Sequence, residues 1–143
     1  MQRTPVLAAG VFTLSLLTFL PAFAAIPSTL PPEQTQGAVT YRSGGIGQDE
    51  AQAFEAAEKQ YPLSLQFVIS RKPRAEFTAD VHVTIADAHG KSLLDTRSEG
   101  PFLLAKLPAG RYTVTAKRQG QTLTKTVHVA THKPAHMMFQ WAA

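Results

Sequence analysis

The segment 100–118 constrains the fold more than any other part of this chain. It reads Gly-Pro-Phe-Leu-Leu-Ala-Lys-Leu-Pro-Ala-Gly-Arg-Tyr-Thr-Val-Thr-Ala-Lys-Arg. An apolar run over 102–107 ends at Pro108-Ala109-Gly110, and a run that alternates apolar and polar residues then begins at Tyr112. Proline fixes φ and cannot donate to a strand ladder, whereas glycine adopts φ > 0 freely. The trio therefore predicts a tight turn between two strands.

Strand patterns continue over most of the chain after Pro62. Apolar and polar residues alternate along several segments, and other short runs are apolar throughout; the predicted strands are 63–70, 81–85, 92–96, 102–107, 111–118, 121–129 and 137–141. Turn residues separate them at 87–90, at 98–101 and at Gln119-Gly120, and the last pair suits a two-residue hairpin. Short strands about ten residues apart with turns between them are typical of an all-β sandwich.

The N-terminal part of the chain has a different composition. Residues 25–38 contain three prolines among polar residues, which predicts an extended lead-in, and Val39–Tyr41 then predicts a short edge strand. The glycine-rich segment Gly44–Gly47 follows. It matches neither nucleotide-binding glycine motif, so we interpret it as a backbone turn that seats the next element, with a ligand or partner loop as the alternative.

One helix is predicted, over 48–60. Asp49 is a candidate N-cap, with Gln52 three residues later as in a capping box, and Pro62 prevents the helix from continuing. Phe54 and Ala57 share one narrow apolar stripe. A stripe with so few large side chains predicts a helix on the surface of the sandwich rather than in its middle.

The first 24 residues have the features of a secretory signal peptide. Arg3 precedes an apolar core over 6–20, and Ala22-Phe23-Ala24 supplies small residues at −3 and −1, which predicts cleavage between Ala24 and Ala25. A membrane anchor is the alternative, but it would need about 20 apolar residues and usually lacks such a site. The expected location is periplasmic or secreted, with no membrane span in the mature chain.

Composition limits what the mature chain can be. Its length suits a single domain over 39–143, and the chain has no cysteine, so neither a disulfide nor a thiolate metal site stabilises it. The formal net charge of +4 falls to +3 when Arg3 is removed with the leader. Because the basic residues are few and scattered, the sequence does not favour nucleic acid as a partner.

The region from about Asp80 to Trp141 resembles the carboxypeptidase regulatory-like domains, which are prealbumin-like, or transthyretin-like, sandwiches. The matching segments are Val81–Ile85, the turn Asp87–Gly90, Gly100-Pro101-Phe102 and Leu107–Val114, and the run at 44–50 resembles small exported bacterial proteins. The resemblance implies a mainly β, seven-stranded antiparallel sandwich, here with one added N-terminal surface helix, that acts as a recognition module. The related hydroxyisourate hydrolases end in Tyr-Arg-Gly-Ser, which this chain lacks.

No catalytic set stands out among the reactive side chains. The five histidines (His82, His89, His128, His132 and His136) fall on polar strand positions and in turns, where solvated surface histidines are expected, although a two- or three-histidine zinc or copper site remains open. The carboxylates Asp49, Glu50, Glu55 and Glu58 lie on the predicted helix. No serine occupies a Gly-x-Ser-x-Gly motif, so we predict no enzyme activity, no catalytic residues and no cofactor.

The predicted function is therefore a non-catalytic exported binding or accessory module of the cell envelope. Its partner is an unidentified envelope protein or glycan. The alternatives are a carbohydrate- or cell-wall-binding module that uses exposed aromatics, and a histidine-based metal-binding protein. Met137, Phe139 and Trp141 share one face of the last predicted strand, where they form either part of the core or an aromatic platform for sugar.

Overall fold

The computed structural model describes residues 30–143, so the predicted signal peptide and its cleavage point between Ala24 and Ala25 lie outside the described residues. The fold is mainly β. Its strands are β1 (Gln34–Gln36), β2 (Val39–Gly44), β3 (Leu63–Ser70), β4 (Glu76–Phe77), β5 (Val81–Ala86), β6 (Ser92–Ser98), β7 (Phe102–Lys106), β8 (Gly110–Arg118), β9 (Gln121–Val129) and β10 (Ala135–Ala142). The helical segments are α1 (Gln48–Ala57) and the 3-10 turn η1 (Glu58–Gln60). Among these residues no helix is long and apolar enough to cross a membrane.

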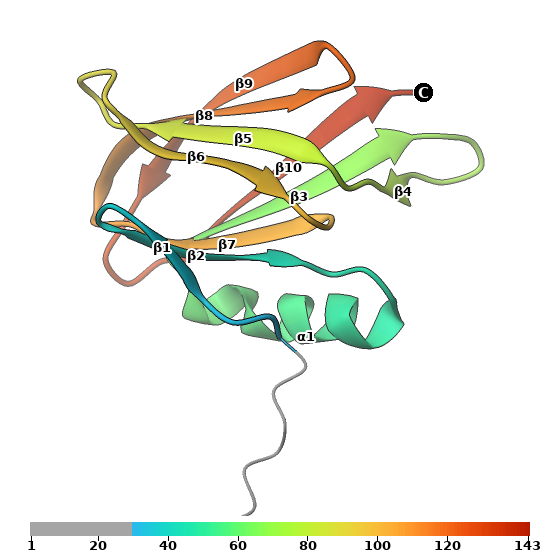
Figure 1. Ribbon diagram of the computed structural model, residues 1–143, viewed down its shortest axis with the longest axis horizontal. Coiled ribbons are helices and arrows are strands. Elements are labelled where there is room, and N and C mark those ends of the chain that lie inside the picture. Colours follow the sequence, from blue (N-terminus) through green and yellow to red (C-terminus); the bar gives the residue numbers. More distant parts are fainter. Residues whose placement is uncertain (1–29) are drawn as a thin grey trace, which may run out of the picture.

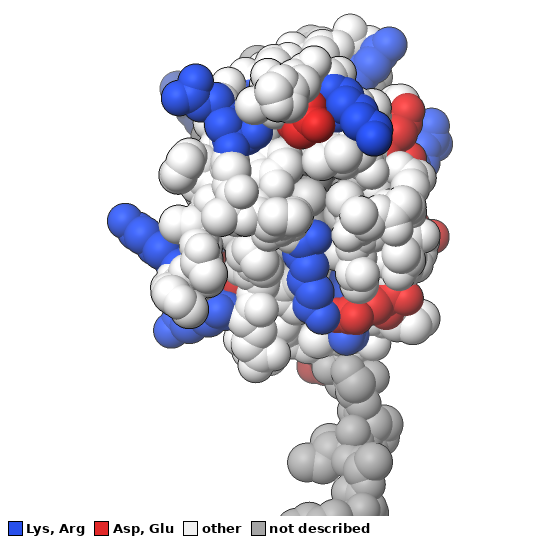
Figure 2. Space-filling view, turned by 90° about the vertical axis from the view of Figure 1, so that its left-hand side faces the viewer, with Lys and Arg blue, Asp and Glu red and all other residues white. Residues whose placement is uncertain are grey.

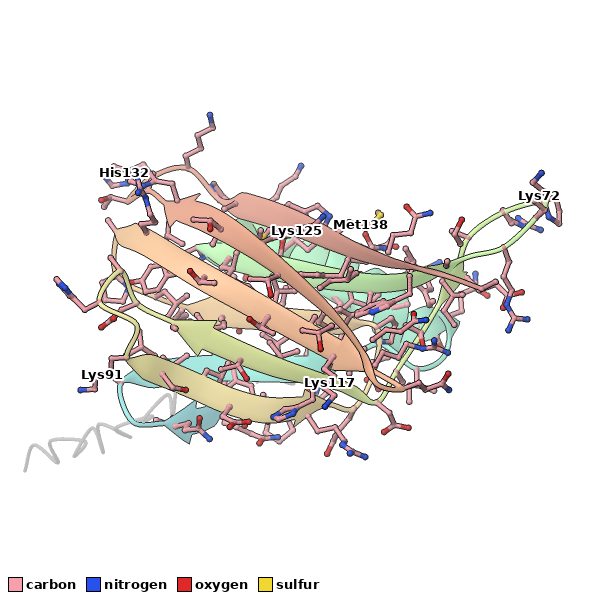
Figure 3. The ribbon with its side chains drawn as sticks, turned by 90° about the horizontal axis from the view of Figure 1, so that it is seen from above. Lys72, Lys91, Lys117, Lys125, His132 and Met138 are labelled. Atoms are coloured by element: carbon pink, nitrogen blue, oxygen red, sulfur yellow. The ribbon has the colours of Figure 1, made fainter. Side chains whose placement is uncertain are left out.

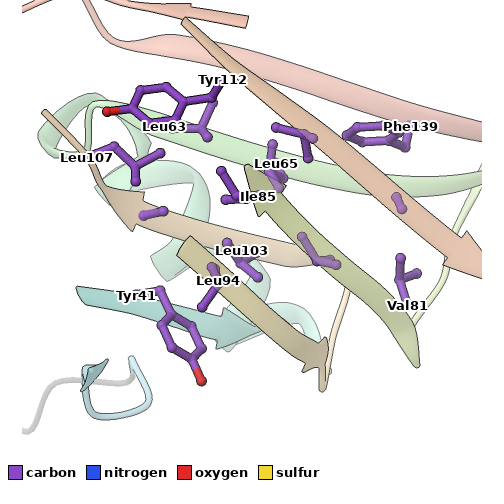
Figure 4. Packing of buried hydrophobic residues seen from close by; sticks show 14 of the residues in the cluster. Tyr41, Leu63, Leu65, Val81, Ile85, Leu94, Leu103, Leu107, Tyr112 and Phe139 are labelled. Atoms are coloured by element: carbon purple, nitrogen blue, oxygen red, sulfur yellow. The ribbon is translucent and has the colours of Figure 1, made fainter. Parts of the chain in front are cut away.

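The strands form two sheets (Figure 1). The first sheet has the order β1-β2-β7-β3-β10, with β4 paired to β3, and the second has the order β6-β5-β8-β9. Apolar side chains from both sheets form one cluster, in which Leu65, Ile85, Leu103 and Val114 are fully buried (Figure 4). This shared cluster is the core, and Val114 and Tyr112 point into it as the alternation after the 108–110 turn predicts.

The predicted turns are present. Gln119 and Gly120 connect β8 to β9 with φ of 47° and 77°, the left-handed conformations that a two-residue hairpin requires. Pro108-Ala109-Gly110 leads from β7 in the first sheet to β8 in the second, so the chain changes sheet there. The Tyr112 hydroxyl donates to the Pro108 carbonyl over 2.6 Å, which ties the start of β8 to this turn.

Two expectations about strands are wrong. The described chain has ten strands rather than seven: β2 contains the separately predicted Val39–Tyr41, and β1 and β4 are short segments held mainly by pairing with their neighbours. The pairing is not wholly antiparallel either, since β10 runs parallel to β3 from Ala135↔Leu63 to Ala142↔Ser70. A parallel pair needs a long crossover, and the second sheet lies within this connection.

The position of Val39–Tyr41 also differs from the prediction. These residues begin β2, which lies inside the sheet between β1 and β7 rather than at its edge. Strand β1 lies within the predicted lead-in 25–38 and pairs antiparallel with β2 from Gln34↔Tyr41 to Gln36↔Val39. The prolines and polar residues of the lead-in gave no period-two signal for this strand.

Helix α1 covers the outer face of the first sheet, below β2 and β7 in Figure 1. Phe54, Ala57 and Tyr61 form a second buried cluster with Phe102 and Leu104 of β7. The helix therefore lies on the surface of the two-sheet body, as its narrow stripe predicts. Both faces of β3 are covered, since Ser64 and Val68 are buried as well as Leu63 and Leu65.

Candidate functional site

A groove of about 650 Å³ lies between the first turns of α1 and the strand β4. Ile46, Gly47, Gln48, Ala51, Phe77 and Pro101 are among the residues that line it. Of the described residues, three large apolar side chains are exposed, and two of them, Ile46 (67 %) and Phe77 (49 %), line this groove. Neighbouring exposed apolar side chains at the rim of a concave surface are typical of a binding site. We call it the Ile46–Phe77 groove.

Two glycines give the loop before α1 its shape. Gly45 has φ of 99°, and the ring of Phe102 lies where a side chain at Gly45 would stand. Gly47 is the N-cap of α1, with φ of 89° and ψ of 154°, a combination that is essentially restricted to glycine. The loop therefore presents the Ile46 side chain to solvent while the backbone on either side turns toward the helix.

The N-terminus of α1 is capped differently from the prediction. Asp49 is not the N-cap and forms no capping box with Gln52, because the helix begins at Gln48 and no side chain caps it. Glu50 instead reaches back, and its carboxylate accepts the Gly45 N–H over 2.7 Å. This bond joins the glycine loop to the first turn of the helix.

Three aromatic rings contact one another next to the groove. Phe54 and Phe102 are fully buried and stack with centroids 5.7 Å apart and an interplanar angle of 11°. The Phe77 ring centroid lies 5.3 Å from that of Phe102, and Phe77 is half exposed. Strand β4 holds it there by pairing Phe77 with Val68 of β3. Of these three rings, Phe77 lines the groove, and its contact with Phe102 joins the groove wall to the buried pair.

Acidic side chains outnumber basic ones around the groove. Glu55 lines it and no Lys or Arg does, while Arg118 donates to the hydroxyl of the lining residue Thr78 over 3.0 Å. A second hollow of about 580 Å³ adjoins it at residues 46–50 and includes Asp49 and Glu50. With a single carboxylate and no histidine along its wall, the Ile46–Phe77 groove offers no pair of groups for proton transfer.

A polar cluster fastens residues 31–33 to the first sheet. The Glu33 carboxylate accepts hydrogen bonds from Lys106 (2.8 Å) and from the Tyr61 hydroxyl (2.7 Å). Arg42 in turn donates to the Tyr61 hydroxyl over 2.7 Å and to the Pro31 carbonyl over 3.0 Å. The Lys106 hydrogen bond, followed by that of Tyr61, lowers the pKa of Glu33 to about 2. Burial, followed by the hydrogen bond to Glu33, raises the pKa of Tyr61. All these groups are partnered, so the cluster is a structural clamp.

A serine, a histidine and a glutamate also meet at the start of β10. The Ser64 hydroxyl lies 2.8 Å from Nδ1 of His136, and the Glu58 carboxylate lies 3.6 Å from the same nitrogen. A hydrolytic triad needs the serine and the carboxylate on opposite nitrogens of the ring. Ser64 is also only 2 % exposed, so a substrate carbonyl cannot reach its hydroxyl. Burial raises the pKa of Glu58, and the nearby His136 lowers it less.

The other candidate residues are dispersed. All five histidines are exposed, and His82 pairs with Asp95 across β5 and β6. Within residues 30–143 no group of three or more His, Cys, Asp or Glu side chains is arranged to hold a metal ion. Lys and Arg side chains are spread over the end of the molecule shown in Figure 2, with acidic ones between them, rather than gathered in one patch.

The aromatic platform on the last strand is not present. Phe139 (0 % exposed) and Trp141 (2 %) are buried, and Met137 packs against the core, so these residues belong to the core.

Comparison of the chain with models of protein families and with curated proteins gave no match. Sequence reasoning singled out the Gly44–Gly47 loop but missed Phe77, because β4 is only two residues long and carries no period-two signal.

Proposed function

We propose that this protein is a non-catalytic binding module of the cell envelope, exported by its signal peptide. The Ile46–Phe77 groove is its binding site, and its occupant is an apolar segment of a partner protein with basic residues beside it. The observation that carries the proposal is the pair of exposed apolar side chains, Ile46 and Phe77, that line one groove. Burying such side chains against a partner is favourable at about 25 cal/mol for each Å² removed from water.

The charge at the rim selects the kind of segment. Asp49, Glu50 and Glu55 flank the groove and its neighbouring hollow, and no Lys or Arg lines either of them. Basic residues next to the apolar segment would therefore gain favourable interactions, while acidic ones would be repelled. The two-sheet body with one shared core supports the further proposal that the domain is a transthyretin-like sandwich related to the carboxypeptidase regulatory-like domains.

Two matched peptides test this function. One carries a Leu-Phe pair flanked by lysines, and the other carries the same pair flanked by glutamates. Titration into isotope-labelled protein should shift the amide signals of residues 45–52 and 77–79 with the lysine peptide, and bind the glutamate peptide about tenfold more weakly or worse. The same titration is repeated with oligosaccharides and with Zn²⁺ or Cu²⁺. Signal shifts with one of those probes but with neither peptide would favour the glycan or the metal alternative.

Two variants distinguish binding at the groove from nonspecific binding to exposed apolar side chains. Ile46→Ser combined with Phe77→Ser removes both exposed apolar side chains of the groove, and should abolish binding of the lysine peptide. Met138→Ser is the matched control, since Met138 is also exposed (42 %) but lies on β10. Equal loss in both variants, or no loss in the double variant, would contradict the proposed site.

A further inference from the structure

The two sheets have four edges, and three of them are protected. Strand β1 is only three residues long. On β6, the side-chain amide of Gln36 accepts the N–H of Asp95 over 2.6 Å and donates to its carbonyl over 3.1 Å. On β10, Lys125 donates to the Met138 carbonyl over 2.5 Å (Figure 3). Short strands and lysines are among the devices by which proteins block sheet edges.

Strand β9 is the fourth edge. Its Lys125 side chain reaches across to the Met138 carbonyl of β10, and the Trp141 indole donates to the Gln121 carbonyl at the hairpin end, so these contacts leave the residues between them uncapped. Its register with β8 runs without a shift from Arg118↔Gln121 to Gly110↔Val129. The pair that closes a two-residue hairpin is hydrogen-bonded, and bonded and non-bonded pairs then alternate along the two strands. Every second residue of β9 therefore directs its backbone N–H and C=O groups away from β8. These residues are Thr122, Thr124, Thr126 and His128, and among the described hydrogen bonds none uses their backbone groups. We call this row the β9 edge.

The sequence of β9 is well suited to adding a strand. It contains neither proline nor glycine, and its edge residues are mainly threonine, which favours strands. The row from Thr122 to His128 spans about 20 Å of regular strand. Open edges of this length are the sites at which other chains add a strand through backbone hydrogen bonds.

The charge near the edge is positive. Residues 100–143 contain no Asp or Glu. Arg111 and Lys117 on β8 lie directly opposite His128 and Thr122, so all four side chains share the outward face. A strand added to β9 would lie about 10 Å from β8, a distance that Lys, Arg and acidic side chains can bridge across β9. Figure 3 shows Lys117 near the hairpin end of the edge and His132 beyond the opposite end.

We propose that the β9 edge binds an extended acidic segment of a partner protein by β-strand addition. The segment carries two acidic residues six positions apart on one face, opposite Thr122 and His128, where Lys117 and Arg111 reach them. A second copy of this chain is disfavoured as the occupant, because it would bring basic β8–β9 ribbons together. This site is independent of the Ile46–Phe77 groove and does not rest on the function proposed there.

The test uses a synthetic nine-residue peptide of alternating Thr and Val with two glutamates six positions apart on one face. Its addition to the purified protein should slow hydrogen exchange at the amides of Thr122, Thr124, Thr126 and His128. A peptide of the same sequence, N-methylated at the amides that would bond to β9, should bind at least about tenfold more weakly. Equal binding of the two peptides, or protection elsewhere, overturns the proposal without any change to the protein.

Protein variants test the charge and the edge separately. The double variant Arg111→Glu with Lys117→Glu should bind the glutamate peptide about tenfold more weakly and should prefer a peptide with lysines in place of the glutamates. The double variant Lys72→Glu with Lys91→Glu has the same net charge and should show neither change. Thr124→Pro removes one outward N–H and should block binding, while Thr124→Val retains it. Undiminished binding by a folded Thr124→Pro variant, or self-association of the protein through β9, contradicts the acidic-segment proposal.

Discussion

Replacing Phe54 by alanine tests whether one ring holds α1 on the sheet. Phe54 is fully buried and stacks on Phe102. Removing a buried phenylalanine costs about 3–5 kcal/mol, a total that includes the loss of its aromatic partner. A domain is stable by only about 5–15 kcal/mol, and a ten-residue helix is marginal without tertiary contacts. We therefore expect α1 to detach before the sheets unfold.

Hydrogen exchange and urea unfolding measure these two effects. In Phe54→Ala the amides of 49–57 should exchange nearly as fast as in a free peptide, while those of β3 and β8 remain protected. Phe77→Ala is the matched control, because that ring also contacts Phe102 but is half exposed, and it should cost about 1 kcal/mol or less. Similar costs for both variants, or full protection of α1 in Phe54→Ala, would refute the reasoning.

Three further predictions concern the core, the loop and the clamp. Val114→Asp should unfold the domain, because an unpaired carboxylate in a fully buried position costs several kcal/mol; an unchanged melting temperature would contradict it. Gly45→Val should cost about 2 kcal/mol or more in urea unfolding, since φ is 99° and the Phe102 ring fills the space; a neutral result would show that the loop relaxes. The pKa of Glu33 is lowered to about 2 from its usual 4.5, so its contribution to stability is present above pH 4.5 and is lost as pH falls toward 2. Thermal scans should show a shallower loss over this range in Glu33→Gln, and an identical loss would exclude the effect.

Local sequence determined the features that depend on neighbouring residues. The Gln119-Gly120 hairpin was predictable because two left-handed residues between alternating runs leave the backbone few other conformations. The buried positions of Val114, Phe139 and Trp141 follow from period two, since one strand face must be apolar if it meets a core. The helix over 48–60 was predictable for the same kind of reason, although α1 ends at Ala57 and a 3-10 turn completes the segment.

Tertiary structure decided what depends on distant partners. Strand β4 has two residues and exists because it pairs with β3, and only that pairing brings Phe77 to the loop at Ile46. The parallel direction of β10 likewise follows from where the chain returns after the second sheet. Whether a strand edge is open depends on side chains from other strands, as Gln36 and Lys125 show. Period and turn chemistry specify which residues face inward, but only the assembled sheets specify which surfaces remain available to a partner.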